Sequence, residues 1–168
     1  MTCQPLQLIS ALAVGALLSA TAQTVPGVGV PDGALVIAGD VSKPLTLTTA
    51  DLQSMPRMTV LVEQQGGQAR YEGVLAGEIL KRAGARLGRD LSGKAYVRAS
   101  AKDGYAVVFS LAELDQEFTP NDIIIADTLD GKPLPATQGP LRLIAPRDKH
   151  GSRFVRMLQR LEVVQLVK

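Results

Sequence analysis

The segment Gly139-Pro140-Leu141-Arg142-Leu143-Ile144-Ala145-Pro146 carries the most informative pattern in this chain. Its centre, residues 141–145, is mostly apolar and stops at a proline, which predicts a short strand. A loop rich in cations follows at residues 146–153, with the sequence Pro-Arg-Asp-Lys-His-Gly-Ser-Arg. We therefore expect a strand that leads directly into a basic loop.

The last 28 residues are distinctly basic. Residues 141–168 are net +5, while the whole chain is only +2, so the rest is net −3. Guanidinium groups and loop amides fit the oxygens of phosphate or sulfate, so this segment is a candidate anion site. A solvated basic face is the simpler interpretation. The cations are Arg142, Arg147, Lys149, Arg153, Arg156, Arg160 and Lys168.

The other notable polar residues are explained by ordinary roles in loops, turns and packing. His150 is the only histidine, so a second imidazole for a metal site or a catalytic triad is missing, and an exposed loop histidine is expected. Asp103 and Asp130 each precede a glycine, which is typical of turns. Tyr105 either presents its hydroxyl to a pocket or packs its ring on a sheet. The residues alone leave the function open.

Strand patterns outnumber helix patterns along the chain. Gly66-Gly67 and Lys102-Asp103-Gly104 each predict a hairpin. Because hairpins outnumber crossovers, we predict an α+β fold with mixed, largely antiparallel sheets and short helices. The predicted strands are residues 34–38, 44–47, 58–63, 69–71, 95–100, 105–109, 123–126, 141–145 and 161–166.

Capping signals place the helices. Thr48 or Thr49 caps a short helix that Pro56 ends, and Ser110 with Glu113 has the spacing of a capping box. Apolar residues at roughly helical spacing over 74–83, followed by glycine, predict a third helix.

The first 22 residues contain no Lys, Arg, Asp or Glu and end on Ala20-Thr21-Ala22. The apolar run is short for a bilayer span and its ending suits a signal peptidase, so residues 1–22 are predicted to be a secretory signal. A periplasmic or secreted protein, without a transmembrane segment after cleavage, is expected. The single cysteine, Cys3, would leave with this signal. An Arg-Arg pair is absent, which favours the general secretory route.

Size and composition indicate one domain. Residues 23–33 are rich in Gly and Pro and are predicted to be a flexible leader, followed by a domain over 34–168. The 168 residues are 46% hydrophobic with a mean hydropathy of +0.14, enough for one core. The near-neutral charge argues against a disordered polyelectrolyte and against a nucleic-acid binder.

The order of six segments resembles a known family. They are Pro44-Leu45-Thr46-Leu47 with Asp51-Leu52 and Pro56; Tyr71-Glu72-Gly73-Val74 with Ile79-Leu80 and Ala83-Gly84; Asp103-Gly104-Tyr105; Asp130-Gly131-Lys132-Pro133-Leu134; residues 139–146; and Arg153-Phe154-Val155-Arg156. In this order they resemble the oxidoreductase molybdopterin-binding domain of the sulfite oxidase family over residues 34–167. The most specific part is the G-P-L-R-L-x-x-P element together with the basic loop that follows it.

The resemblance implies a cofactor that this sequence is poorly equipped to hold. Enzymes of the family bind molybdenum through a pterin dithiolene and one cysteine, which follows the strand similar to residues 58–62. Here that place reads Glu63-Gln64-Gln65-Gly66-Gly67. Carboxylate and amide oxygens are hard ligands that do not replace a soft thiolate. We therefore expect the fold to carry over, but neither a bound metal nor the catalytic centre.

The resemblance also implies where an anion would bind. In family members the strand at 141–145 and its basic loop lie near the pterin phosphate, which gives Arg142, Arg147, Lys149, Arg153 and Arg156 as a candidate wall. Weaker candidates for the pocket rim are Arg70, Asp103 and Tyr105.

Three functions remain open. The first is an exported binding or accessory module for a small anion or a periplasmic protein partner, without catalysis. The alternative is a molybdopterin-dependent oxidoreductase with an atypical ligand at Glu63 or Gln64. A purely structural role is a third interpretation.

Overall fold

The computed structural model describes residues 31–64, 66–88, 94–120 and 122–166. The predicted signal over 1–22, its Cys3 and residues 23–30 of the predicted leader lie outside the described residues. The described strands are β1 (Leu35–Gly39), β2 (Leu45–Leu47), β3 (Met58–Gln64), β4 (Gly67–Leu75), β5 (Ala95–Ala101), β6 (Ala106–Ser110), β7 (Ile124–Leu129), β8 (Lys132–Pro133), β9 (Arg142–Ile144) and β10 (Leu158–Gln165). The helical elements are α1 (Thr49–Gln53), α2 (Ala76–Arg82) and two 3₁₀ turns, η1 (Leu111–Leu114) and η2 (Gly151–Arg153).

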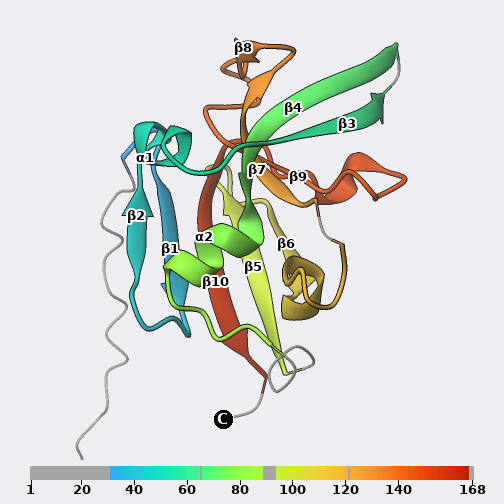
Figure 1. Ribbon diagram of the computed structural model, residues 1–168. Helices are drawn as coiled ribbons and strands as arrows, with labels where there is room; N and C mark the ends of the chain where they lie inside the picture. Colours follow the sequence, from blue (N-terminus) through green and yellow to red (C-terminus); the bar gives the residue numbers. More distant parts are fainter. Residues whose placement is uncertain (1–30, 65, 89–93, 121, 167–168) are drawn as a thin grey trace, which may run out of the picture.

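The strands form two sheets (Figure 1). The first sheet has the order β2-β1-β10-β5-β6, and the second has the order β3-β4-β7-β8, with β9 also paired to β7. Among the described strands, only β1 and β10 pair in parallel. The predicted α+β class with largely antiparallel sheets is therefore confirmed.

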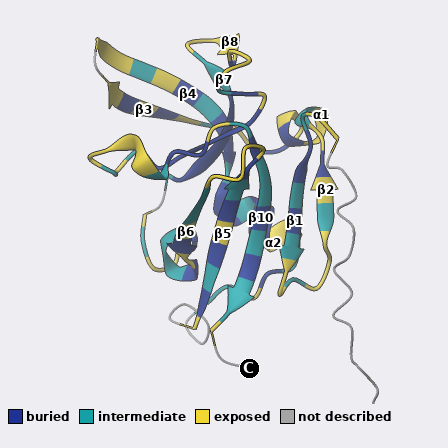
Figure 2. Ribbon diagram, turned by 180° about the vertical axis from the view of Figure 1, so that it is seen from behind, coloured by how far each residue is buried: buried dark blue, intermediate teal, exposed yellow. Residues whose placement is uncertain are grey.

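The core lies along the central strands of both sheets, while the β3–β4 hairpin projects away from the body and is exposed toward its tip (Figure 2). The largest fully buried side chains of the core include Tyr71, Phe109, Ile124, Leu143 and Leu35. Among the described residues, no helix has the length and apolar content that crossing a bilayer would require.

The capping signals are confirmed. The Thr48 side chain accepts from the amide of Asp51 at the start of α1, and Asp51 accepts in return from the Thr48 amide. Ser110 and Glu113 form the same reciprocal box at η1, which is a 3₁₀ turn and not an α-helix. Such a box satisfies backbone donors that lack a partner inside the helix.

The predicted start of the third helix is wrong. Val74 and Leu75 belong to β4, where they pair with Ile125 and Ile124 of β7, and α2 begins only at Ala76. Apolar residues that are buried on both faces of a strand fit a helical spacing equally well over a short window. Cross-strand pairing decides between the two structures here.

β4 bends where it meets β7. The register shifts between Glu72 and Gly73, and the backbone of Gly73 packs directly on that of Ile125 and Ala126. A glycine at this bulge allows the two backbones to approach closely. The turn from β7 to β8 has Asp130 at φ +50° and Gly131 at φ +75°, as the Asp-Gly pair predicted.

Candidate functional site

Arg142, the cation of β9, is buried and only 7% exposed. One of its terminal nitrogens, Nη1, donates to the Tyr71 hydroxyl at 2.8 Å and to the side-chain oxygen of Gln138. Its guanidinium lies over the ring of Tyr71, 5.4 Å from the centroid, and over that of Phe154, 5.7 Å away. The site around Arg142 is thus built from neutral groups.

The positive charge of Arg142 has no carboxylate beside it among the described residues. Its Nε is buried and has no hydrogen-bond partner there. Burial lowers the pKa of the Arg142 guanidinium, and the nearby charge of Arg156 lowers this pKa as well, while Tyr71 opposes them. The charges of Arg142 and Arg156 therefore oppose each other, and neither arginine forms an ion pair with a carboxylate of the described residues.

Two other arginines of the predicted wall are paired with carboxylates. Arg153 binds Asp148 through two hydrogen bonds of 2.7 and 2.6 Å and donates to Glu113 at 2.9 Å. Arg147 donates through its Nε to Asp122 at 2.8 Å. Because their charge is already balanced, these two arginines contribute less to an anion site than their sequence suggested.

Arg156 shares a surface hollow of about 250 Å³ with two of the predicted rim residues, Asp103 and Tyr105. We call this the Arg156 hollow; its other lining residues are Ala101, Gly151, Ser152 and Phe154. The Tyr105 hydroxyl donates to the carbonyl of Ser152, and Asp103 accepts from the Tyr105 amide, as expected of a turn residue. Phe154 lines the hollow and also contacts the guanidinium of Arg142, which is not itself a lining residue.

The remaining predicted residues lie apart. Lys149 and the loop histidine His150 are exposed, and neither forms an ion pair with another described residue. Arg70 is on β4, where it pairs with Glu72 at 2.8 Å, and it does not line the Arg156 hollow. The predicted wall is therefore not one continuous surface, and whether any of it binds an anion stays a prediction.

A polar chain that the sequence did not reveal links Arg142 to the β3–β4 hairpin. Gln64 donates to the Tyr71 hydroxyl at 3.0 Å, and this same hydroxyl accepts from Arg142, whose Nη1 also reaches Gln138. The sequence pattern predicts only that Tyr71 lies in a strand, whereas its two side-chain partners come from β3 and β9.

The described residues do not fit a molybdenum ion. They include no cysteine and no group of three or more His, Cys, Asp or Glu side chains placed to hold a metal. Where the family has its thiolate, Glu63 is exposed and accepts from Gln68, and Gln64 is engaged with Tyr71. A soft thiolate cannot be replaced by these oxygen and nitrogen donors.

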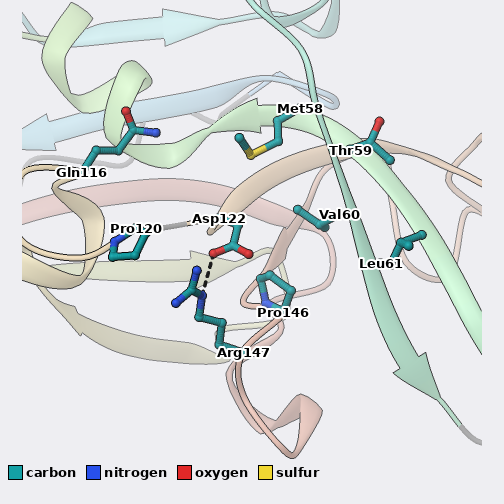
Figure 3. A pocket seen from close by; sticks show the side chains of 9 residues that line it. All are labelled: Met58, Thr59, Val60, Leu61, Gln116, Pro120, Asp122, Pro146 and Arg147. Carbon is teal, nitrogen blue, oxygen red and sulfur yellow. Dashed lines mark hydrogen bonds and ion pairs between the residues drawn. The ribbon is translucent and has the colours of Figure 1, made fainter.

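A larger hollow than the Arg156 hollow lies elsewhere, between β3 and the loops after η1 and β9 (Figure 3). We call it the β3 groove; it encloses about 550 Å³ and is open to solvent. Its lining residues are Met58, Thr59, Val60, Leu61, Gln116, Pro120, Asp122, Pro146 and Arg147. The two charged members, Asp122 and Arg147, neutralise each other, so the groove is suited to an uncharged surface.

Acid should destabilise this protein through two of its ion pairs. Burial would raise the pKa of Asp127, but hydrogen bonds from Arg57 and Thr128 outweigh it and hold that pKa below its ordinary value. Burial and hydrogen bonds from Arg153 and Ser110 act on the pKa of Glu113 in the same way. A carboxyl with a lowered folded-state pKa stabilises above its unfolded pKa, near 4, and loses that contribution as pH falls through the folded value.

We therefore expect the free energy of unfolding, measured by urea titration, to be level at neutral pH and to fall below about pH 4. The double variant Glu113→Gln with Asp127→Asn should have a flatter acid limb. An acid limb as steep as that of the wild type would contradict this assignment.

Comparisons with known proteins agree with this fold. The sequence model of the oxidoreductase molybdopterin binding domain matches residues 23–166. The crystal structure of the sulfane dehydrogenase SoxCD from Paracoccus pantotrophus is similar with a TM-score of 0.64 and 23% sequence identity. This similarity, which concerns the fold alone, covers 79% of the present chain and 38% of that chain. No curated protein matches. The chain belongs to the oxidoreductase molybdopterin-binding domain family.

Proposed function

We propose that this chain is an exported, non-catalytic binding module that binds a small oxyanion, such as phosphate or sulfate, at the Arg156 hollow. The observation that carries this proposal is the unbalanced positive charge of Arg142 and Arg156. Arg142 has only neutral hydrogen-bond partners, and Arg156 has no ion pair among the described residues. A buried cation without a counter-charge is costly, so a bound anion would stabilise the fold.

The lining of the hollow supports this position for the anion. Arg156 lines it directly, and Arg142 lies over the ring of Phe154, another lining residue, and adds to the positive potential. The lining includes one carboxylate, Asp103, which accepts from the amide of Tyr105. By contrast, the hollow that contains Arg147 and Arg153 also contains Glu113, Asp122 and Asp148, which disfavour an anion.

Anion binding should appear as thermal stabilisation. Millimolar sulfate or phosphate is expected to raise the Tm of the wild type above its value in chloride at the same ionic strength. Arg156→Gln should lose most of this increase because it removes the cation that lines the hollow. Arg147→Gln is the matched control, since Arg147 is paired with Asp122, and it should keep the increase. Equal stabilisation of the wild type and Arg156→Gln would exclude the hollow as the site.

The absence of catalysis is tested on protein isolated from its native host. Metal and pterin analysis should find neither molybdenum nor a pterin, because the chain offers no thiolate for the metal outside Cys3. Stoichiometric molybdenum would instead support the alternative, a molybdopterin-dependent oxidoreductase with an atypical ligand at Glu63 or Gln64. The family match makes this second outcome worth testing.

A further inference from the structure

β3 is an edge strand whose outer side has no neighbour among the described strands. It pairs only with β4, through seven consecutive residue pairs without a bulge. Every second residue of such a strand directs its backbone N–H and C=O groups away from the sheet, where another strand can bind them. The open edge lies directly beside the β3 groove (Figure 3).

Two of the other edge strands are protected, whereas β3 is long and open. β2 has only three residues, and β8 consists of Lys132 and Pro133 alone. β6 is also an edge strand, but with five residues it is shorter than β3, which has seven. Short length, proline and charge are the usual ways to prevent edge pairing. Residues 58–62 of β3, with the sequence Met-Thr-Val-Leu-Val, have none of them.

The sequence of β3 is complementary to itself when two copies run antiparallel. With Leu61 on the two-fold axis, Val60 faces the partner's Val62 and Thr59 faces the partner's Glu63. Apolar residues then meet apolar residues on both faces, and Thr59 can donate to the carboxylate opposite. The two Glu63 carboxylates would be four residues apart along the strand, about 14 Å, which is beyond the Debye length.

The side chains of β3 suit this arrangement. Val60 and Val62 are buried on the face toward the core, and Figure 3 shows Met58 and Val60 on the side of Asp122 and Pro146. Leu61 is on the opposite face and is 53% exposed. A second β3 strand would extend the valine row across the β3 groove and would cover Leu61 with its own equivalent.

We propose that this protein forms a two-fold symmetric dimer in which the β3 strands of two copies pair antiparallel around Leu61. The interface continues the second sheet across the axis and closes the β3 groove against solvent. The pairs nearest the axis are apolar or Thr–Glu, and the outermost pair joins Met58 to the uncharged Gln64. A second copy of this chain therefore meets the edge without placing like charges opposite each other. This proposal is independent of anion binding at the Arg156 hollow.

Two matched variants test the dimer by sedimentation velocity over a series from about 1 µM to about 200 µM, since dimer populations depend on concentration. Leu61→Glu places two carboxylates against each other on the axis, and Val108→Glu makes the same change on the edge strand β6. Both residues are 53% exposed. Leu61 faces Arg70 across the ladder and Val108 faces Arg98, so each new carboxylate gains an arginine within its own fold.

We expect the wild type and Val108→Glu to sediment as dimers and Leu61→Glu to dissociate at least tenfold more readily. An equal mixture of Leu61→Glu and Leu61→Lys should form a heterodimer again, because opposite charges then meet on the axis. A wild type that stays monomeric over the whole series would overturn the proposal. The unpaired edge of β3 would then be available to a strand of a different protein. A dimer that survives Leu61→Glu, or that only Val108→Glu dissociates, would overturn it as well.

Discussion

Replacing Asp127 by alanine is expected to lower the free energy of unfolding by about 3 kcal/mol. Asp127 lies in β7 and is 5% exposed. Its two carboxylate oxygens accept from Arg57 at 2.8 and 2.5 Å, and one of them also accepts from the Thr128 hydroxyl at 2.8 Å. Removing the carboxylate leaves a partly buried guanidinium without its counter-charge, which is strongly destabilising.

The unpaired charge can be distinguished from the lost volume. In the double variant Arg57→Met with Asp127→Leu, two apolar side chains replace the pair, and most of the stability should return. Asp122→Ala is the control, because it removes a carboxylate from the mostly exposed Arg147 and should cost less than about 0.5 kcal/mol. Urea unfolding of the four proteins measures these differences. A double variant that is no more stable than Asp127→Ala would show that the unpaired charge is not the cause.

Gly73→Ala should be equally damaging, at about 3 kcal/mol, for a purely steric reason. An added Cβ would overlap with the carbonyl oxygen of Ile125 and would lie 2.6 Å from the Cα of Ala126. Both obstacles are backbone atoms of β7, the strand on which β4, β8 and β9 all pair. Neither can move without opening the second sheet.

The matched control is Gly151→Ala, which makes the same change where space exists. Its nearest contact would be Phe154 Cδ2 at 3.5 Å, and neither glycine has a positive φ that would add backbone strain. Gly151→Ala should change the midpoint of urea unfolding by no more than corresponds to about 0.5 kcal/mol. If both variants unfolded at the same urea concentration, close packing at the β4 bulge would not be the reason for Gly73.

Local signals predicted most of the fold. The turns at Gly66-Gly67 and Asp130-Gly131 and the boxes at Thr48 and Ser110 depend on residues within a few positions of one another, and all are present. The start of α2 depends on something distant, because only pairing with β7 shows that Val74 and Leu75 are strand residues. The resemblance to the sulfite oxidase family, carried by the order of segments, is confirmed by the family match.

The candidate site was less predictable because charge balance is a property of the folded chain. The basic loop was found from composition, but the carboxylates that neutralise Arg147 and Arg153 include Asp122 and Glu113, which lie 25 and 40 positions away. Nor did any local pattern predict that Arg142 would be buried against Tyr71, 71 positions earlier. Concentrated cations in a sequence therefore do not by themselves give a positive surface.

The position of β10 has a consequence for synthesis on the ribosome. It is translated after the other described strands, yet it lies in the middle of the first sheet, parallel to β1 on one side and antiparallel to β5 on the other. Before it emerges, the β1–β2 and β5–β6 ribbons have no shared neighbour, and two-stranded ribbons are marginally stable alone. The nascent chain should therefore stay sensitive to protease until residues 158–165 leave the exit tunnel, and become resistant in one late step.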